Sequence, residues 1–480
     1  MGRGLDIDRR RPDARIMAPS RSSSSSPSRV DRSRRSFLFA AGALAAAPAL
    51  GLAQPGRAAD PSATTTATAK AKSKNDRLQV GFIGTGNQGM GLLKRFLQWD
   101  LGDVVAVCDV NEGSHGYREP EHFYGREPAR QLVQDKTGRN PAAHADFRDV
   151  LAMDEVDAVV IVLPDHWHAP ASIAAARAGK HIYCEKPLTL TLAEGQPLAD
   201  EVAQAGVTFQ VGSHERSRRS TRWVCERVLS GAIGEVSDAA TVVGFNNKVG
   251  PGPGWQPQPV PDGFDYADWL GPATEQPYHP DRCLYRFRFN YDYSGGQVTN
   301  FGAHSLDIAQ WGLDKQAEHA AEVVCTHAKF LPEGSLFNTA LESDFRLTYA
   351  DGTPITCTSD DAKVQCRFNG ADGWIQTGYA GTTASRPELI EGVPPQRAPK
   401  GELDAHSLHL QNFVQACAGK AELNAPLPIG RAAAELCHLA NVAIRRFPEH
   451  GEQVLKWNGE AFTDPVDANA LRGVSAMPPA

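Results

Sequence analysis

Three glycines in the pattern Gly84-x-Gly86-x-x-Gly89 lie between an apolar run of strand type and a stretch whose apolar positions have helical spacing. Gly84 permits a tight turn, Gly86 lets the backbone approach a phosphate closely, and Gly89 allows the helix to pack tightly on the strand. The N-terminus of that helix offers unpaired N–H groups to negative charge. The pattern therefore predicts a loop that holds the pyrophosphate of a dinucleotide.

Asp109 ends the next apolar run, residues 103–109, and lies 25 residues after Gly84. A carboxylate at the end of this second strand can accept hydrogen bonds from a ribose and repels a 2′-phosphate. The cofactor predicted from these residues is therefore NAD rather than NADP. Asn87 and Gln88, inside the glycine pattern, are expected to contact the same cofactor.

Two further polar clusters directly follow strand-like runs: Pro164-Asp165-His166-Trp167-His168 and Glu185-Lys186-Pro187. In an open α/β sheet, ligands bind beyond the carboxyl ends of the strands. Lys186, flanked by apolar sheet, is expected to have a lowered pKa that suits proton transfer near neutral pH. No cysteine or carboxylate cluster of ligand spacing accompanies the two histidines, so we expect no metal site. The candidate cofactor contacts here are Pro164, His166, His168, Glu185 and Lys186.

The elements that must position these residues fall into two parts. Up to residue 209, strand-like runs alternate with helical stretches, which predicts a Rossmann domain over 77–209 and an α/β fold class. From residue 210, several strand-like runs follow one another with short turns, which predicts an α+β domain with a largely antiparallel open sheet over 210–480. Its C-terminal helical stretch, 431–446, is expected to pack back on the Rossmann domain. A Pro- and aromatic-rich stretch, 250–285, is expected to form a long loop around the substrate cleft.

The first 59 residues are predicted to be an export signal, and residues 60–76 a flexible linker. Ser33-Arg34-Arg35-Ser36-Phe37-Leu38, followed by an alanine-rich apolar run, resembles a twin-arginine signal. The apolar run is shorter than the ~20 residues that span a bilayer, so no stable membrane insertion is expected. Twin-arginine export carries folded proteins. We therefore expect the export machinery as a partner, a periplasmic or otherwise exported location, and a cofactor that is bound tightly before export.

The charge and the cysteine content of the chain bear on its partners and on its redox state. The chain has 480 residues and a formal net charge of −7, which gives no reason to expect binding to nucleic acid. Its nine cysteines are dispersed without CxxC pairs, which predicts mostly reduced core thiols.

The glycine pattern, the Pro164–His168 cluster, Cys184-Glu185-Lys186-Pro187 and Gly302-Ala303-His304-x-x-Asp307 occur in the order and spacing of the Gfo/Idh/MocA oxidoreductases. That family includes glucose–fructose oxidoreductase and inositol 2-dehydrogenase. The chain from about residue 78 to its C-terminal stretch resembles the family, and in particular its exported twin-arginine members. The resemblance implies a nicotinamide cofactor, a carbohydrate or cyclitol substrate, and a homo-oligomer formed through the sheet of the second domain.

The resemblance also implies roles for single residues. Lys186 matches the lysine that touches the substrate and the nicotinamide ribose, and His304 matches the histidine that acts as acid and base. Asp307, one helical turn further on, either orients the His304 ring or begins the helix that follows. Family members usually carry an aspartate where this chain has Asn300, and asparagine can position a hydroxyl but cannot take its proton. Further candidate substrate contacts are Asp307, His214, Arg216, Arg286, Arg288 and Tyr291.

Two functions remain open at this point. The first is NAD(P)-dependent oxidation of a hydroxyl on a sugar, sugar derivative or cyclitol, with His304 and Lys186 handling the proton. The second, implied by some exported relatives, is redox-neutral glycoside hydrolysis, in which oxidation, elimination, hydration and reduction follow one another on the same NAD. Export, a retained cofactor and Asn300 favour the second function. The wider family favours the first, which is the function we predict.

Overall fold

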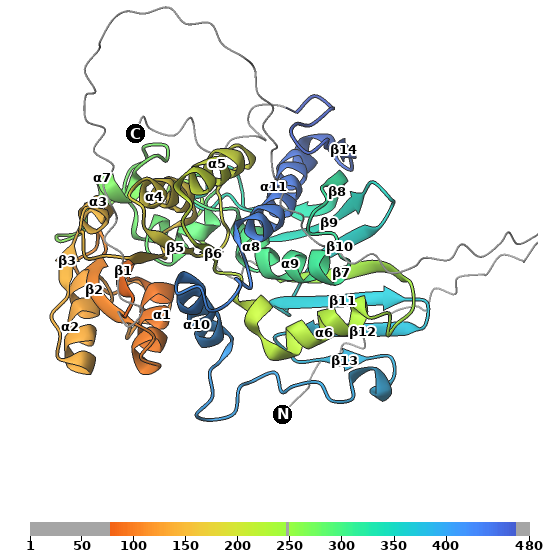
Figure 1. Ribbon diagram of the computed structural model, residues 1–480. Coiled ribbons are helices and arrows are strands. Elements are labelled where there is room, and N and C mark those ends of the chain that lie inside the picture. Colours follow the sequence, from red (N-terminus) through yellow and green to blue (C-terminus); the bar gives the residue numbers. More distant parts are fainter. Residues whose placement is uncertain (1–76, 246–248, 467–480) are drawn as a thin grey trace, which may run out of the picture. The chain divides into compact units, whose positions relative to one another are not determined.

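Strands and helices alternate from residue 79 onward in the computed structural model, which describes residues 77–245 and 249–466 (Figure 1). All described residues belong to one unit, Lys72–Ala480. The predicted export signal, 1–59, and linker, 60–76, lie outside the described residues.

The first half of the described chain builds a sheet of six parallel strands in the order β3-β2-β1-β4-β5-β6. Helices cover both faces of the sheet, which explains why its strands are nearly continuous apolar runs. This is the predicted Rossmann arrangement. The strands are β1 (Gln79–Ile83), β2 (Asp103–Cys108), β3 (Ala142–His144), β4 (Ala158–Ile161), β5 (His181–Cys184) and β6 (Phe209–Val211).

Helices α1 and α2 lie on one face of this sheet, and α3, α4 and α5 lie on the other (Figure 1). The sequence did not reveal α2, β3 or α3, because only two residues of α2, Ala129 and Val133, are buried and its apolar pattern is weak. The helices are α1 (Asn87–Gln98), α2 (Arg126–Thr137), α3 (Phe147–Leu151), α4 (Asp165–Arg177) and α5 (Gly195–Ala205), with short 3-10 turns η1 (Leu192–Glu194) and η2 (His214–Ser217).

Helix α4 begins at Asp165, four residues before the alanine-rich stretch that starts at Ala169. Its first turn is Asp165-His166-Trp167-His168, and Pro164 is the capping residue. Asp165 in a first turn is favourable because the N-terminus of a helix carries partial positive charge. The polar cluster is therefore held on a rigid helix at the end of β4 rather than on a loop.

The second half builds a mixed sheet of eight strands in the order β13-β12-β11-β7-β10-β9-β8-β14. Only β7 and β10 pair in parallel, and the other neighbours are antiparallel, so the predicted fold class is confirmed. The strands are β7 (Val236–Gly244), β8 (Ala320–Lys329), β9 (Glu342–Tyr349), β10 (Pro354–Asp360), β11 (Val364–Gly370), β12 (Gly373–Gly378), β13 (Thr383–Ala384) and β14 (Leu455–Lys456).

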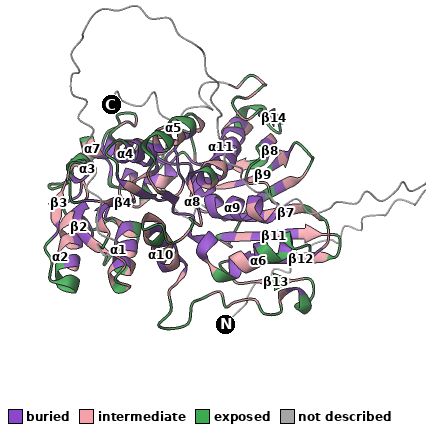
Figure 2. Cartoon of the chain, in the orientation of Figure 1, coloured by how far each residue is buried: buried purple, intermediate pink, exposed green. Residues whose placement is uncertain are grey.

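Helices α6, α9 and α11 pack along one face of this second sheet (Figure 1). The apolar side chains between these helices and the sheet form the core of the second domain. Helix α9 is buried along its length except at Trp311 (Figure 2). Helix α11 also contacts β6 and α5, so it joins the two sheets. The remaining helices are α6 (Arg219–Leu229), α7 (Tyr266–Leu270), α8 (Gly296–Asn300), α9 (Gly302–Gly312), α10 (Ala405–Cys417) and α11 (Leu427–His450), with 3-10 turns η3 (Pro280–Arg282), η4 (Arg286–Phe289) and η5 (Pro387–Ile390).

All nine cysteines fall within the described residues; each is unpaired and eight are buried. No helix within residues 77–245 and 249–466 is both long enough and apolar enough to cross a membrane.

Candidate functional site

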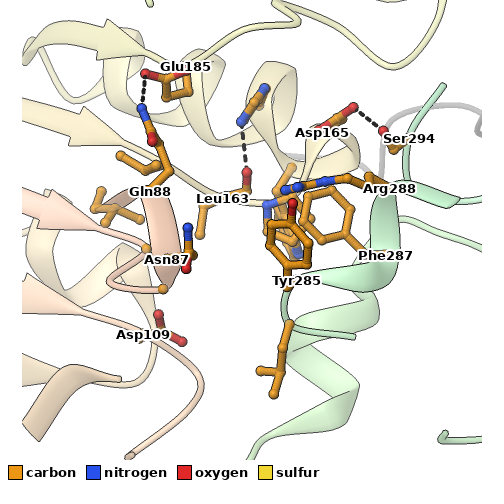
Figure 3. A pocket seen from close by; sticks show the side chains of 18 of the residues that line it. Asn87, Gln88, Asp109, Leu163, Asp165, Glu185, Tyr285, Phe287, Arg288 and Ser294 are labelled. Atoms are coloured by element: carbon orange, nitrogen blue, oxygen red, sulfur yellow. Dashed lines mark hydrogen bonds between the residues drawn. The ribbon is translucent and has the colours of Figure 1, made fainter. Parts of the chain in front are cut away.

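A cavity of about 390 Å³ lies at the carboxyl ends of the parallel strands (Figure 3). One wall comes from the loops after β1, β2, β4 and β5. The other comes from the segment 284–288 and from residues of α8, α9 and α10. Part of the predicted loop 250–285 also lines the cavity, through Phe264 and Trp269. Residues of the Rossmann domain and of the second domain therefore both line the cavity.

The glycine loop forms one end of this cavity. Gly84 has a φ of +88°, and a side chain there would collide with the carbonyl of Val162. A side chain on Gly89 would collide with the carbonyl of Gly84. The N-terminus of α1 has no side-chain cap and no acidic residue in its first turn, so its N–H groups are available to an anion. Asn87 and Gln88 line the cavity beside it.

Asp109 lines the same end of the cavity, below Asn87 in Figure 3. Its carboxylate accepts from Thr85 N at 2.8 Å and from Asn111 N at 2.9 Å. Burial raises the pKa of Asp109, although these hydrogen bonds oppose the rise. Each carboxylate oxygen can accept more than one hydrogen bond, so a ribose hydroxyl can still be bound here.

The histidines of the α4 cluster have different surroundings. His166 is fully buried away from the cavity, where Nε2 donates to the carbonyl of Trp269 at 2.9 Å. Burial lowers the pKa of His166 to about 4. His168 lines the cavity, and its Nδ1 and Nε2 lie 2.6 and 2.8 Å from the carbonyl oxygens of Pro187 and Leu163. The structure thus brings His168, but not His166, into the predicted cofactor site.

Lys186 lines the cavity and connects the two domains. Its Nζ donates to the backbone oxygen of Asn300 at 3.0 Å and to Oδ1 of the same residue at 3.2 Å. Burial lowers the pKa of Lys186; Glu185 opposes this change and Arg288 adds to it. Glu185 is buried and accepts from Gln88 at 3.4 Å, which connects the lysine motif to the glycine loop.

His304 lies on α9 next to Lys186 and is 3% exposed. Burial lowers its pKa well below the usual value, and His214 and Lys186 lower it further. His214 meets the His304 ring edge to face, with ring centroids 4.7 Å apart, and stacks on His406 at 3.6 Å. All three histidines line the cavity. A neutral imidazole at His304 can accept a proton from a ligand.

Three of the predicted substrate contacts lie outside the cavity. Arg216 and Asp307 form a buried bidentate pair with two distances of 2.8 Å, and neither lines the cavity. Asp307 therefore neither orients His304 nor begins the helix: it lies in the middle of α9 and neutralises Arg216. Tyr291 also lies outside the cavity, where Arg445 lies over its ring.

Of the two arginines named as candidate substrate contacts in this segment, Arg288 lines the cavity and Arg286 does not. The Arg288 guanidinium lies over the Tyr285 ring, with its Cζ 4.1 Å from the ring centroid (Figure 3). Asp165 lines the cavity as well and accepts from Ser294 at 2.5 Å. Within the residues that the structure describes, no group of three His, Cys, Asp or Glu side chains is placed to hold a metal ion.

Sequence reasoning missed several residues of the cavity wall. Tyr117 lies against the glycine loop, where a side chain on Gly86 would come 2.9 Å from its ring. His406 is the second residue of α10, and Tyr379 follows β12. None of these belongs to a motif, so only the three-dimensional arrangement reveals them.

Comparison with known proteins gives matches over both domains. Residues 78–213 match the Gfo/Idh/MocA model described as oxidoreductase family, NAD-binding Rossmann fold. Residues 226–445 match the model described as oxidoreductase family, C-terminal alpha/beta domain. An alpha-N-acetylgalactosaminidase from Shewanella oneidensis is 29% identical over 208 residues, which cover 42% of this chain and 44% of that protein. The match thus spans less than half the length of this relative.

Solved structures share the fold over most of the chain. The aldose-aldose oxidoreductase from Caulobacter crescentus, complexed with glycerol, has a TM-score of 0.58 at 20% identity and covers 79% of this chain and 100% of its own. The WlbA dehydrogenase from Bordetella pertussis, in complex with NADH and UDP-GlcNAcA, has a TM-score of 0.56 at 17% identity and covers 80% and 99%. At these identities the likeness establishes the fold.

Proposed function

The chain belongs to the Gfo/Idh/MocA oxidoreductase family, and from that premise we propose that it is an NAD(P)-dependent oxidoreductase acting on a hydroxyl of a sugar, sugar derivative or cyclitol. The observation that carries the proposal is the position of Lys186 and His304. Both lie in the cavity whose other end is the glycine loop. The carbohydrate substrate is supported by the relatives, one of which is an alpha-N-acetylgalactosaminidase and another an aldose-aldose oxidoreductase.

The residues present fit a dinucleotide. The turn at Gly84 and the close contacts at Gly89 leave no room for side chains, and the uncapped N-terminus of α1 offers N–H groups to a pyrophosphate. Asp109 favours NAD over NADP because a carboxylate repels a 2′-phosphate. When bound, the nicotinamide ring supplies the hydride acceptor.

Lys186 orients the substrate in this proposal. An ammonium group has three N–H donors, and two of them point to oxygens of Asn300. The third is available to the oxygen of a substrate hydroxyl, where a positive charge stabilises a developing alkoxide. His304 takes the hydroxyl proton, because its lowered pKa leaves the ring neutral at neutral pH.

A second function, redox-neutral glycoside hydrolysis, is favoured by Asn300 and by the alpha-N-acetylgalactosaminidase among the relatives. Asn300 gives Lys186 neutral oxygen partners where the family usually has a carboxylate. The two functions differ in their net products. A dehydrogenase accumulates reduced cofactor, and a hydrolase of this type returns it to the oxidised state.

The experiment that separates the two uses the full-length protein with NAD and two sets of compounds, free sugars and aryl glycosides that include an aryl N-acetylgalactosaminide. The proposed function predicts steady accumulation of NADH with a free sugar. Aglycone release without net NADH would instead establish the hydrolase. The same assay repeated with NADP measures the preference attributed to Asp109.

We also propose export by the twin-arginine pathway with NAD already bound, and assembly into a homo-oligomer. The export signal is supported by the Arg34-Arg35 sequence, and the oligomer by the resemblance to family members that associate through the second sheet. Fractionation of cells that express the chain with Arg34→Lys and Arg35→Lys replacements tests the first proposal: the protein should remain in the cytoplasm. Sedimentation of the purified protein tests the second.

A further inference from the structure

Two buried ring nitrogens beside the cavity have no hydrogen-bond partner among the described residues: Nδ1 of His214 and Nδ1 of His304. The two rings meet edge to face, with centroids 4.7 Å apart and planes at 67°. A buried polar atom without a partner is destabilising because nothing compensates for its lost hydration. Two such atoms on adjacent rings at a cavity wall therefore call for a functional explanation.

Glu215 determines which nitrogen of His214 carries the hydrogen. It is 1% exposed and accepts from Arg218 at 2.7 and 2.8 Å. Burial alone would raise its pKa, but the hydrogen bonds from His214 and Arg218 hold it well below the usual value. Nε2 of His214 lies 3.3 Å from this carboxylate, which can only accept, so Nε2 carries the hydrogen. A neutral His214 ring then has its lone pair at Nδ1.

His214 is also fixed in orientation. His406 stacks on its face, with ring centroids 3.6 Å apart and planes at 23°. The helices that carry these residues come from different parts of the chain, so the arrangement is held by tertiary packing on several sides. The ionisable groups that face His304 are Lys186 after β5, His214 and Glu215 on η2, Arg218 before α6 and, across the His214 ring, His406 on α10.

We propose that His214 is the positioning residue for His304, a role that rests on the proposed function. When ligands fill the cavity, Nδ1 of His214 accepts a hydrogen bond from Nδ1 of His304. Catalytic hydrogen bonds are often long without ligands and shorten in the complex. His304 is thereby held in the tautomer whose Nε2 is unprotonated and faces the substrate hydroxyl.

The proton and electron balance of the step is simple. The O–H bond of the substrate hydroxyl breaks, and its proton moves to Nε2 of His304. When NAD is bound at the glycine loop, its nicotinamide ring would accept the hydrogen of the neighbouring C–H together with its electron pair. Glu215 remains a carboxylate and, through His214, stabilises the positive charge on the His304 ring, as a buried carboxylate does for a histidine base.

Three variants of the full-length protein test this role. His214→Phe keeps an aromatic ring against His406 and removes the acceptor. His214→Asn places an oxygen close to the former Nδ1 position. His438→Gln is the matched control, since His438 is a buried histidine that bonds to Thr189 Oγ1 at 2.9 Å outside the cavity.

We expect His214→Phe to lower kcat by roughly 100-fold, whereas His214→Asn and the control stay within about tenfold of the wild type. In the ligand complex, where the hydrogen bond forms, loss of the acceptor removes the group that stabilises protonated His304 and lowers the pKa of His304. The acid limb of the kcat profile, which reports the complex, therefore moves to lower pH in His214→Phe. Equal losses in the Phe and Asn variants, or an acid limb that is unmoved or moves upward, would overturn the proposal.

The tautomer of His304 supplies a test that needs no turnover. The ¹⁵N shifts of the ring, assigned by their loss in His304→Gln, should show hydrogen on Nδ1 in the NAD-treated wild type and a mixture of tautomers in His214→Phe. Hydrogen on Nε2 in the wild type would overturn the proposal. A failure of the proposed function appears separately, as a wild-type protein that oxidises no carbohydrate.

Discussion

Two groups of histidines in this protein differ in what their ring nitrogens touch. At the start of α4, both ring nitrogens of His168 face backbone carbonyls. Nε2 of His166 also faces a carbonyl, and its Nδ1 is buried away from the cavity without a partner among the described residues. Where η2, α9 and α10 meet, the rings of His214 and His304 contact each other, and each keeps a buried nitrogen without a partner among the described residues. Backbone carbonyls hold a ring in place, whereas an unpartnered nitrogen on a residue that lines the cavity can exchange a proton with a ligand. The comparison separates histidines that shape the site from those that can perform chemistry in it.

Replacement of Lys186 should have the largest effect on turnover, because this residue lies between His304 and the cofactor end of the cavity. We expect Lys186→Ala to lower kcat by about 1,000-fold or more, since it removes both the substrate contact and the positive charge. Steady-state kinetics with saturating NAD measures the effect. Unchanged turnover in a folded variant would show that the active site has been placed in the wrong part of the cavity.

His304→Gln tests directly whether the histidines with an unpartnered nitrogen at the cavity, His214 and His304, take part in proton transfer. The amide keeps some hydrogen bonding but cannot take a proton, so we expect kcat to fall about 100-fold to 10,000-fold. In the wild type, activity should be lost as the pH falls through the pKa of His304, because protonation removes the base. That acid limb should be absent in the variant. If the limb persists, another group is the base.

The Arg216–Asp307 pair tests whether burial without access to the cavity means a purely structural role. Arg216→Met leaves the Asp307 charge buried and should lower the free energy of unfolding by about 3–5 kcal/mol. Arg219→Met, which removes an exposed pair with Glu402, is the control and should cost less than about 1 kcal/mol. Denaturant unfolding measures both. The KM for the carbohydrate should be unchanged in Arg216→Met. A higher KM would indicate that Arg216 does contact the substrate.

His166 should govern stability in acid rather than activity. Its pKa is about 4 in the folded protein against 6.5 usually, so the unfolded chain takes up a proton first as the pH falls. The free energy of unfolding should therefore decrease between pH 6.5 and 4, by about 3 kcal/mol from this residue. His166→Leu should reduce the decrease by this amount, whereas His409 and His438, whose pKa values are also lowered by burial, keep their own contributions. The variant should leave kcat within about twofold. A large loss of kcat would mean that His166 does reach the cofactor.

The smallest effect is expected from Asn300→Asp. A carboxylate 3.2 Å from Nζ raises the pKa of Lys186, so the alkaline limb of the kcat/KM profile should move upward by about one pH unit. The alkaline limb is lost where Lys186 gives up its proton. An unmoved limb would show that the charge of Lys186 does not control the rate.

Much of the fold and the cofactor end of the site could be predicted from the sequence, for a physical reason. The glycine loop and the strand-end clusters are local patterns, and the order of strands in an α/β sheet brings their ends together. The second sheet was recognisable from its alternating strands, although the hairpin partner β12 was not identified. Helix α2 was missed because few of its residues are buried.

The substrate end was harder because its contacts join distant segments. Arg216 and Asp307 are 91 residues apart, and each separately resembles a polar substrate contact. Only the structure shows that they neutralise each other. His406 belongs to no motif, and its position beside His214 depends on the packing of α10 against η2. Pairings of this kind depend on tertiary structure rather than on spacing in the sequence.

The most direct test of the proposed oxidation follows a single hydrogen. A free sugar deuterated at each ring carbon is incubated with the full-length protein and an excess of NAD, and the nucleotide is analysed by mass spectrometry and NMR. The proposal predicts deuterium at C4 of the reduced nicotinamide, in amounts equal to the sugar oxidised, and none with Lys186→Ala. The absence of deuterium from the nucleotide while the carbohydrate is converted would contradict it.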